Sequence, residues 1–147
     1  MKLRHLYLDD VRTPLNDTWE VVRSYDEFKA WLIENYTNDG EYYPEPVVIG
    51  LTVSFDHDLA DEHYTPQELW TNFSASDKHQ SSQNYSEKTG LDCAKLMVEM
   101  NLIPADCNSH SMNPVGQANI CGYLDGWYRF NNMTLRCGHN TQIPFKI

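Results

Sequence analysis

The run VVIGLTVSF at residues 47–55 constrains the fold more than any other stretch of the chain. It is nearly continuous in apolar residues and rich in the β-branched types that favour strands. A strand with one wet face alternates apolar and polar residues, whereas a strand buried in a parallel sheet is hydrophobic along its length. We therefore expect residues 47–55 to form a central strand of a parallel sheet that is covered on both sides.

Shorter segments with strand composition lie on either side of this run, bounded by polar or turn-forming residues. We predict strands at residues 3–8, 19–22 and 106–111. The tail, residues 129–147, has no clear periodicity and is expected to add at most one strand.

Three other segments carry apolar residues at helical spacing. We predict helices at residues 24–36, 89–100 and 113–128. The first opens with a Ser-x-x-Glu capping box at Ser24 and Glu27. The second is expected to be closed off by Pro104. The third opens with Asn113-Pro114, a capping residue followed by a proline suited to the first helical position.

The order of these elements predicts an α/β fold with an open parallel sheet flanked by helices. With 147 residues, of which 41% are hydrophobic, the chain fits one globular domain over residues 1–147. Within it, residues from about 59 to 88 form a long polar insertion. A connection of that length in a compact domain is usually a functional lid or a mobile segment.

The charge balance narrows the class of ligand. The net charge is −10, with 21 acidic and 11 basic residues. Because binding to duplex nucleic acid depends on clusters of lysine and arginine, we expect no such partner, whereas a small anion stays open. No run approaches the roughly 20 apolar residues that span a bilayer, and no signal peptide is recognisable. We expect a cytoplasmic protein with four reduced, mostly buried cysteines.

Polar residues that can carry chemistry follow three of the predicted strands. They are Asp9-Asp10, Asp56-His57-Asp58 and His110-Ser111-Met112-Asn113. Each group alone has a plain structural explanation, as a turn, a cap or a buried histidine. If the strands are parallel, however, all three groups emerge at the carboxyl edge of the sheet, where open α/β sheets bind ligands. Their coincidence favours one crevice that holds four carboxylates and two imidazoles.

Two kinds of chemistry suit such a crevice. An oxygen-rich cluster binds a hard divalent cation, Mg²⁺ or Mn²⁺, and histidine ligands would shift the preference toward Mn²⁺ or a softer metal. Alternatively, the two histidines work without a metal as general base and general acid, with Asp56 or Asp58 orienting His57. The sequence leaves both open.

Several groups near the same edge could hold a phosphate. Arg12 could clamp phosphate oxygens, or it could pair with Asp9 or Asp10. Thr89 stands at the start of a helix, where free backbone amides attract anions. Ser111 and Asn113 stand at the start of the next one.

Four motifs taken together resemble the cyclic-phosphate-processing receiver-like domains, which are common in bacteria and their phages. The motifs are LDDVRTP (8–14), SFDHDLA (54–60), TGLDCAKLM (89–97) and HSMNPVGQANICGYLDGW (110–127). Residues from about 61 to 86 depart from the family's pattern. The resemblance implies a receiver-like, flavodoxin-like fold, and it implies the opening of a cyclic phosphate on an RNA end or on an ADP-ribose derivative. The absence of a lysine after the last strand counts against phosphorelay.

The leading hypothesis is therefore a hydrolase, a metal-assisted phosphoesterase that opens a cyclic phosphate on a small nucleotide-type ligand. The resemblance places Asp9, Asp10 and Asp56 at the positions that hold Mg²⁺ in receivers. The expected catalytic residues are His57, His110, Asp58 and Asp56, and those expected to bind substrate are Arg12, Thr89, Ser111 and Asn113.

Two alternatives belong to other functional classes. One is a binding protein that sequesters a cyclic nucleotide signal without turnover, which would serve a phage against host defence. The aromatic residues of the insertion could then stack on a base. The other is a degenerate phospho-receiver that is phosphorylated on Asp56. The sequence leaves the oligomeric state open.

Overall fold

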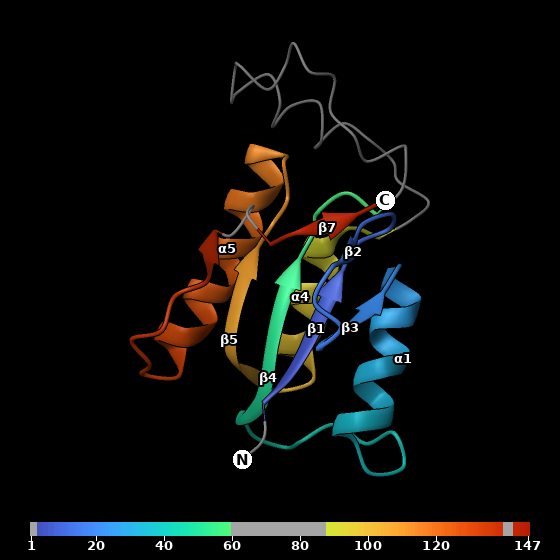
Figure 1. Ribbon diagram of the computed structural model, residues 1–147. Helices are drawn as coiled ribbons and strands as arrows, with labels where there is room; N and C mark the ends of the chain where they lie inside the picture. Colours follow the sequence, from blue (N-terminus) through green and yellow to red (C-terminus); the bar gives the residue numbers. More distant parts are fainter. Residues whose placement is uncertain (1–2, 60–87, 140–142) are drawn as a thin grey trace.

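The computed structural model describes residues 3–59, 88–139 and 143–147, so nearly all of the predicted insertion lies outside the described residues. In the described residues, one five-stranded sheet has the order β3-β1-β4-β5-β6, and every pairing in it is parallel (Figure 1). Its strands are β1 (Arg4–Leu8), β3 (Trp19–Val22), β4 (Val47–Phe55), β5 (Leu102–Ser109) and β6 (Gly138–His139). The predicted receiver-like α/β fold with a parallel sheet is confirmed.

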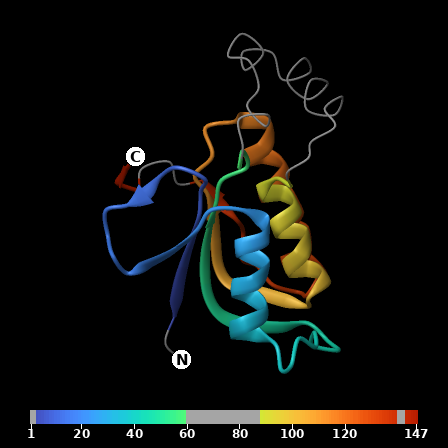
Figure 2. The same ribbon diagram turned by 90° about the vertical axis from the view of Figure 1, so that its right-hand side faces the viewer.

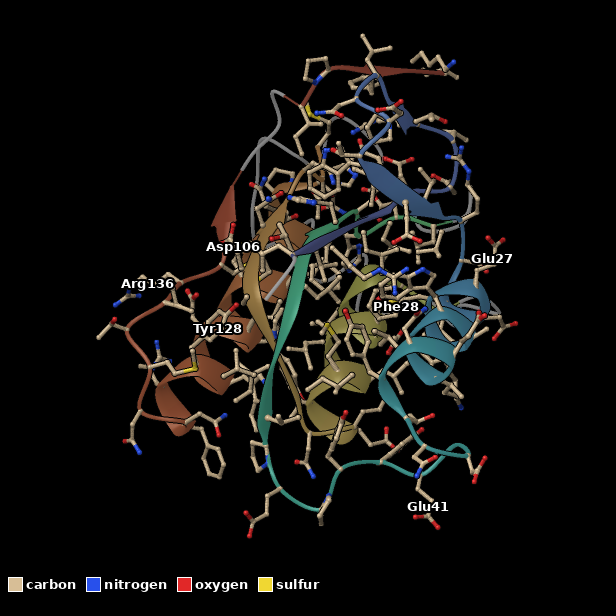
Figure 3. The ribbon with its side chains drawn as sticks, turned by 60° about the horizontal axis from the view of Figure 1, so that its bottom comes forward. Glu27, Phe28, Glu41, Asp106, Tyr128 and Arg136 are labelled. Atoms are coloured by element: carbon tan, nitrogen blue, oxygen red, sulfur yellow. The ribbon has the colours of Figure 1, made fainter. Side chains whose placement is uncertain are left out.

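The described helices are α1 (Tyr25–Tyr36), α4 (Gly90–Glu99) and α5 (Pro114–Phe130), and they lie on one face of the sheet (Figures 1 and 2). Phe28 of α1 contacts Phe55 of β4, with ring centroids 5.9 Å apart. The Tyr128 hydroxyl of α5 lies 3.3 Å from the Cys107 sulfur of β5. Figure 3 shows Phe28 directed toward the interior, while Glu27 and Glu41 point away from it.

The prediction that β4 is covered on both sides holds near the carboxyl end of the strand, where side chains on the other face are buried, whereas Val48 near its start is exposed. In the part of the chain that the structure describes, no helix lies on this face. Two short antiparallel strands, β2 (Thr13–Pro14) and β7 (Phe145–Lys146), lie beside it near the carboxyl edge (Figure 2). The side chains on this face include Tyr7, Thr52 and Ser54, which are buried although two of them are polar. A hydrophobic strand sequence therefore indicates that the strand is buried, but it does not tell whether helices or other segments bury it.

The element boundaries agree with the sequence except around β5. This strand begins at Leu102, four residues before the predicted start, and Pro104 lies inside it rather than at a helix end. Helix α4 ends because Asn101 takes a left-handed conformation, with φ 61°, which asparagine tolerates better than most residues. Pro104 pairs with Ile49, where the β4–β5 register shifts, and an irregular register tolerates a residue that has no N–H to donate.

Two smaller predictions were partly right. The Ser24 side chain caps α1 by accepting a hydrogen bond from the Glu27 amide at 3.2 Å, but the Glu27 carboxylate accepts from the amide of Arg23 instead of Ser24. The tail contributes two short strands, β6 and β7, one more than expected.

All four cysteines are free and buried, as predicted. Among the described residues, none of the helices has the length and apolar character needed to span a bilayer.

Candidate active site

The parallel hydrogen-bond ladder continues one residue past the carboxyl ends of β1, β4 and β5. The amide of Asp9 donates to Val22 O (3.1 Å), that of Asp56 to Leu8 O (3.0 Å), and that of His110 to Phe55 O (3.0 Å). These bonds place Asp9, Asp56 and His110 next to one another on adjacent strand ends. The predicted convergence of the three polar segments is confirmed.

Asp9 and His110 form a buried pair at the centre of this edge. Nε2 of His110 lies 3.0 Å from Oδ2 of Asp9, and the side chains are 2% and 0% exposed. Oδ1 of Asp9 accepts the amides of Val11 (2.9 Å) and Arg12 (2.8 Å). Burial alone would raise the pKa of Asp9, but its contact with His110 and the hydrogen bonds from the two amides outweigh it and hold that pKa below its usual value. Burial lowers the pKa of His110, and Asp9 offsets only part of this effect.

Asp56 has the opposite electrostatic behaviour. Burial, and after it the carboxylates of Asp9 and Asp58, raises the pKa of Asp56 to about 8, and Arg12 offsets only part of the shift. Three acidic groups this close repel one another when all are charged. A cation between them would relieve that repulsion.

The residues at this edge fit a divalent cation. One ligand atom from each of Asp9, Asp56 and His110 lies within 4.8 Å of the other two, and all three residues are buried. Oδ1 of Asp10 is also buried, and it has no hydrogen-bond partner among the described residues. Burial, followed by the charge of Asp9, raises the pKa of Asp10. The sequence expected Asp9, Asp10 and Asp56 as the ligands, whereas the structure brings His110 into the group and leaves Asp10 beside it.

His57 is held by a chain of hydrogen bonds that ends at helix α5. Its Nδ1 lies 2.9 Å from Oδ1 of Asp58, and Asp58 accepts from the Asn113 side-chain amide at 3.2 and 3.3 Å. Asn113 caps α5 by accepting the Gly116 amide at 3.1 Å. A Cβ on Gly116 would lie 2.3 Å from Cγ of His57, so only glycine allows the ring to pack here. The start of α5 therefore fixes both His57 and Asp58.

The start of helix α4 is occupied by contacts within the protein. The Gly90 amide donates to His57 O at 2.8 Å, and a Cβ on Gly90 would lie 1.8 Å from Asp56 O. The Thr89 amide and hydroxyl contact Oδ2 of Asp92 at 2.8 and 3.3 Å. Thr89, expected to bind phosphate, thus lies beside the site with its polar groups engaged in its own helix.

Arg12 lies over the site and contacts both sides of the Asp9–His110 pair. Its Nη1 donates to His110 O at 3.4 Å, and its Nε lies 3.8 Å from Oδ2 of Asp9. The guanidinium stacks on the Phe145 ring, 5.0 Å from its centroid. The predicted ion pair with Asp9 is present, and the side chain keeps 19% exposure through which an anion can reach it. The hydroxyl of Ser111 accepts the Asn113 amide at 3.1 Å.

A comparison with known protein families found one matching family model. The model of the family described as "Cyclic-phosphate processing Receiver domain" matches residues 4–126. The chain belongs to this family. The matched range contains every predicted site residue, from Asp9 to Asn113. No curated protein and no solved structure matches the chain.

In this cyclic-phosphate processing receiver domain, four residues that sequence reasoning missed support the site. Tyr7 stacks on His110, with ring centroids 4.2 Å apart and planes 8° from parallel. Ser54 Oγ lies 2.7 Å from Nδ1 of His110 and donates to Oδ1 of Asn108 at 2.6 Å. Arg23 donates to the carbonyls of Asp9 (3.3 Å) and Arg12 (2.5 Å), and it thereby fixes the loop after β1.

The sequence contains a signal for two of these four residues. Ser54 and Asn108 stand two places before Asp56 and His110, so they share a sheet face with the site residue that follows on the same strand. The pairing of Ser54 with Asn108, however, requires the register between β4 and β5. Nothing in the spacing of Arg23 indicates its contacts.

Proposed function

We propose that this protein is a phosphoesterase that opens a cyclic phosphate on a nucleotide, an RNA end or an ADP-ribose derivative. One observation carries the proposal: Asp9, Asp56 and His110 offer ligand atoms within 4.8 Å of one another, in a family described by its processing of cyclic phosphates. Arg12 and the Asp58-bound His57 belong to the same edge. This combination supplies charge stabilisation and proton transfer together.

The charge-stabilising part consists of Asp9, Asp56 and His110, with Asp10 beside them. A divalent cation, when bound, supplies positive charge next to the phosphate and so stabilises the negative charge that develops there. Arg12 binds phosphate oxygens from the exposed side, where its guanidinium is held against Phe145.

The acid–base part is His57. Asp58 engages its Nδ1, so Nε2 is the nitrogen left for proton transfer. Water adds to phosphorus, the ring P–O bond breaks, and the proton of water passes through Nε2 to the leaving oxygen. The products are an open phosphomonoester and a free hydroxyl group. The acid–base role that the sequence assigned to His110 stays a prediction, which variants at both histidines test.

The test is turnover by the purified full chain with Mg²⁺ or Mn²⁺. Nucleoside 2′,3′-cyclic phosphates and ADP-ribose cyclic phosphate are incubated with the protein, and products that have gained one water are followed by mass spectrometry. Asp56→Asn is expected to abolish turnover. Asp106→Asn, at an exposed position on β5 (Figure 3), is the matched control and should keep full activity.

Other outcomes identify the rival functions. Stoichiometric binding of an intact cyclic nucleotide would support a protein that sequesters its ligand. A stable acyl phosphate on Asp56 after treatment with acetyl phosphate would support a phospho-receiver. Wild-type rates in a folded Asp56→Asn protein would falsify the catalytic assignment.

A further inference from the structure

His110 is held by polar side chains that lie on the sheet face opposite the described helices. Ser54 on β4 and Asn108 on β5 are register partners. The Ser54 hydroxyl is 2.6 Å from Oδ1 of Asn108 and 2.7 Å from Nδ1 of His110. Ser54 is 0% exposed and His110 is 2% exposed. The three side chains therefore form a continuous hydrogen-bonded chain that runs from half-buried Asn108 to buried Ser54 and His110.

The direction of these hydrogen bonds determines which ring nitrogen carries the proton. A serine hydroxyl has one hydrogen to donate, and here it donates to Oδ1 of Asn108. Ser54 must then accept from His110, so the proton of the neutral ring lies on Nδ1. Nε2 is left with its lone pair directed at the carboxylate group of Asp9, 3.0 Å away. Two electron-rich atoms at that distance repel unless a positive charge lies between them.

The plane of the ring is fixed as well. Tyr7, 1% exposed, stacks on His110 with a centroid distance of 4.2 Å and an angle of 8° between the planes. The stack fixes the plane of the ring, and the contact of Nδ1 with Ser54 keeps Nε2 on the side of Asp9. Metal-bound histidines characteristically have this arrangement, in which the second ring nitrogen donates to a fixed acceptor.

We propose that Ser54 and Asn108 are positioning residues that commit Nε2 of His110 to a cation held with Asp9 and Asp56, and that the site therefore prefers Mn²⁺ to Mg²⁺. Mg²⁺ takes oxygen ligands almost exclusively, whereas later divalent metals accept imidazole. The inference rests on the cation of the proposed function but not on its substrate or reaction.

The experiment measures binding of Mn²⁺ alone and of Mg²⁺ alone to the full chain, by calorimetry and by the Mn²⁺ electron paramagnetic resonance signal. Wild-type protein is expected to bind Mn²⁺ at least about tenfold more tightly than Mg²⁺. Ser54→Ala should weaken Mn²⁺ binding by roughly 10- to 100-fold, the range found for residues that support metal ligands. Mg²⁺ binding should fall less, so the ratio of the Mg²⁺ dissociation constant to the Mn²⁺ dissociation constant becomes smaller.

Thr52→Ala is the matched control, because Thr52 is buried on the same strand and the same face as Ser54. It should keep the wild-type ratio. Asn108→Ala, at a half-buried position, tests the same chain if Ser54→Ala does not fold, and it should narrow the ratio in the same direction. His110→Asp should shift the preference toward Mg²⁺.

Nitrogen chemical shifts of the His110 ring give a second readout that needs neither metal nor substrate. The metal-free wild-type protein should show the proton on Nδ1, and Ser54→Ala should lose that bias. A proton on Nε2 in the wild-type protein, or an unchanged Mn²⁺ to Mg²⁺ ratio in both Ser54→Ala and Asn108→Ala, would overturn the inference.

The two proposals fail in distinguishable ways. If Ser54→Ala narrows the metal ratio but no cyclic phosphate is turned over, the metal inference stands and the proposed function fails. If turnover is found with equal binding of both metals, the proposed function stands and the metal inference fails.

Discussion

The two histidines of the candidate site are held from opposite faces of one sheet. His57 lies on the helix-covered side, where Asp58, Asn113 and the start of α5 fix it. His110 lies on the other side, where Tyr7, Ser54 and Asn108 fix it through stacking and hydrogen bonds. The position of His57 therefore depends on helix packing, and that of His110 depends on strand register. Changes confined to one face should disturb one histidine and spare the other.

The largest expected difference comes from replacing each histidine. His57→Ala should lower kcat by roughly 10²- to 10⁴-fold, the usual contribution of an acid–base group, while Mn²⁺ binding stays near wild type. His110→Ala should abolish turnover and weaken Mn²⁺ binding together. Steady-state kinetics and metal titration of both variants check this, and equal loss of metal binding in the two would show that the histidines are not separate in role.

The next effect concerns stability and pH in the metal-free protein. The pKa of Asp56 is about 8 in the folded state, against about 3.9 in an unfolded chain. Because the folded value is the higher one, the contribution favours folding below pH 4 and is lost as the pH rises through 8. In urea unfolding, the free energy of unfolding should fall by on the order of 2–4 kcal/mol between pH 5 and pH 9.

Asp56→Asn should remove most of this pH dependence and stabilise the metal-free protein at pH 8. Mn²⁺ should do the same for the wild-type protein, because the cation replaces the proton. An equally steep loss of stability in Asp56→Asn would mean that another group is responsible.

A smaller effect is expected from the helix-covered face alone. Gly116→Ala places a methyl group against the His57 ring and should cost about 1–3 kcal/mol of stability, with reduced turnover and an unchanged His110 tautomer. Gly122→Ala is the matched control on α5, since a Cβ there meets nothing within 4 Å. It should stabilise the helix by about 0.5–1 kcal/mol. Chemical denaturation of both variants and the nitrogen shifts of the histidines provide the measurements.

The smallest effect is expected where the tail meets the site. Phe145→Ala removes the ring on which Arg12 is stacked, a contact of about 0.5–1 kcal/mol at an exposed site. The KM for a cyclic phosphate should rise by a small factor while kcat holds. A fall in kcat with no change in KM would contradict the phosphate-binding role of Arg12.

The sequence predicted the half of this arrangement that depends on local pattern. The apolar run at 47–55 identified the central strand, and the carboxyl-edge rule for parallel sheets placed Asp9, Asp56 and His110 together. Asn113 was recognised as a helix cap, although its link through Asp58 to His57 was not. These features depend on where strands end and on helix capping, and both can be recognised from residues that are close together in the sequence.

The other half depends on register and on which face each helix covers. Ser54 and Asn108 meet only because β4 and β5 pair in one register, and a shift of one residue would separate them. The place of Pro104 inside β5 was missed because the irregular pairing that tolerates it involves Ile49, on a partner strand far away in the sequence. The contacts of Thr89 with Asp92 likewise depend on the conformation of the helix start, and its role in binding phosphate stays a prediction.

The most direct test of the account is a crystal structure of the protein with Mn²⁺, in which anomalous scattering locates the ion. We predict one ion at the carboxyl edge, about 2.0–2.6 Å from carboxylate oxygens of Asp9 and Asp56 and from Nε2 of His110. An ion bound by Asp10 and Asp56 without His110, or no ion at this edge at saturating Mn²⁺, would contradict it.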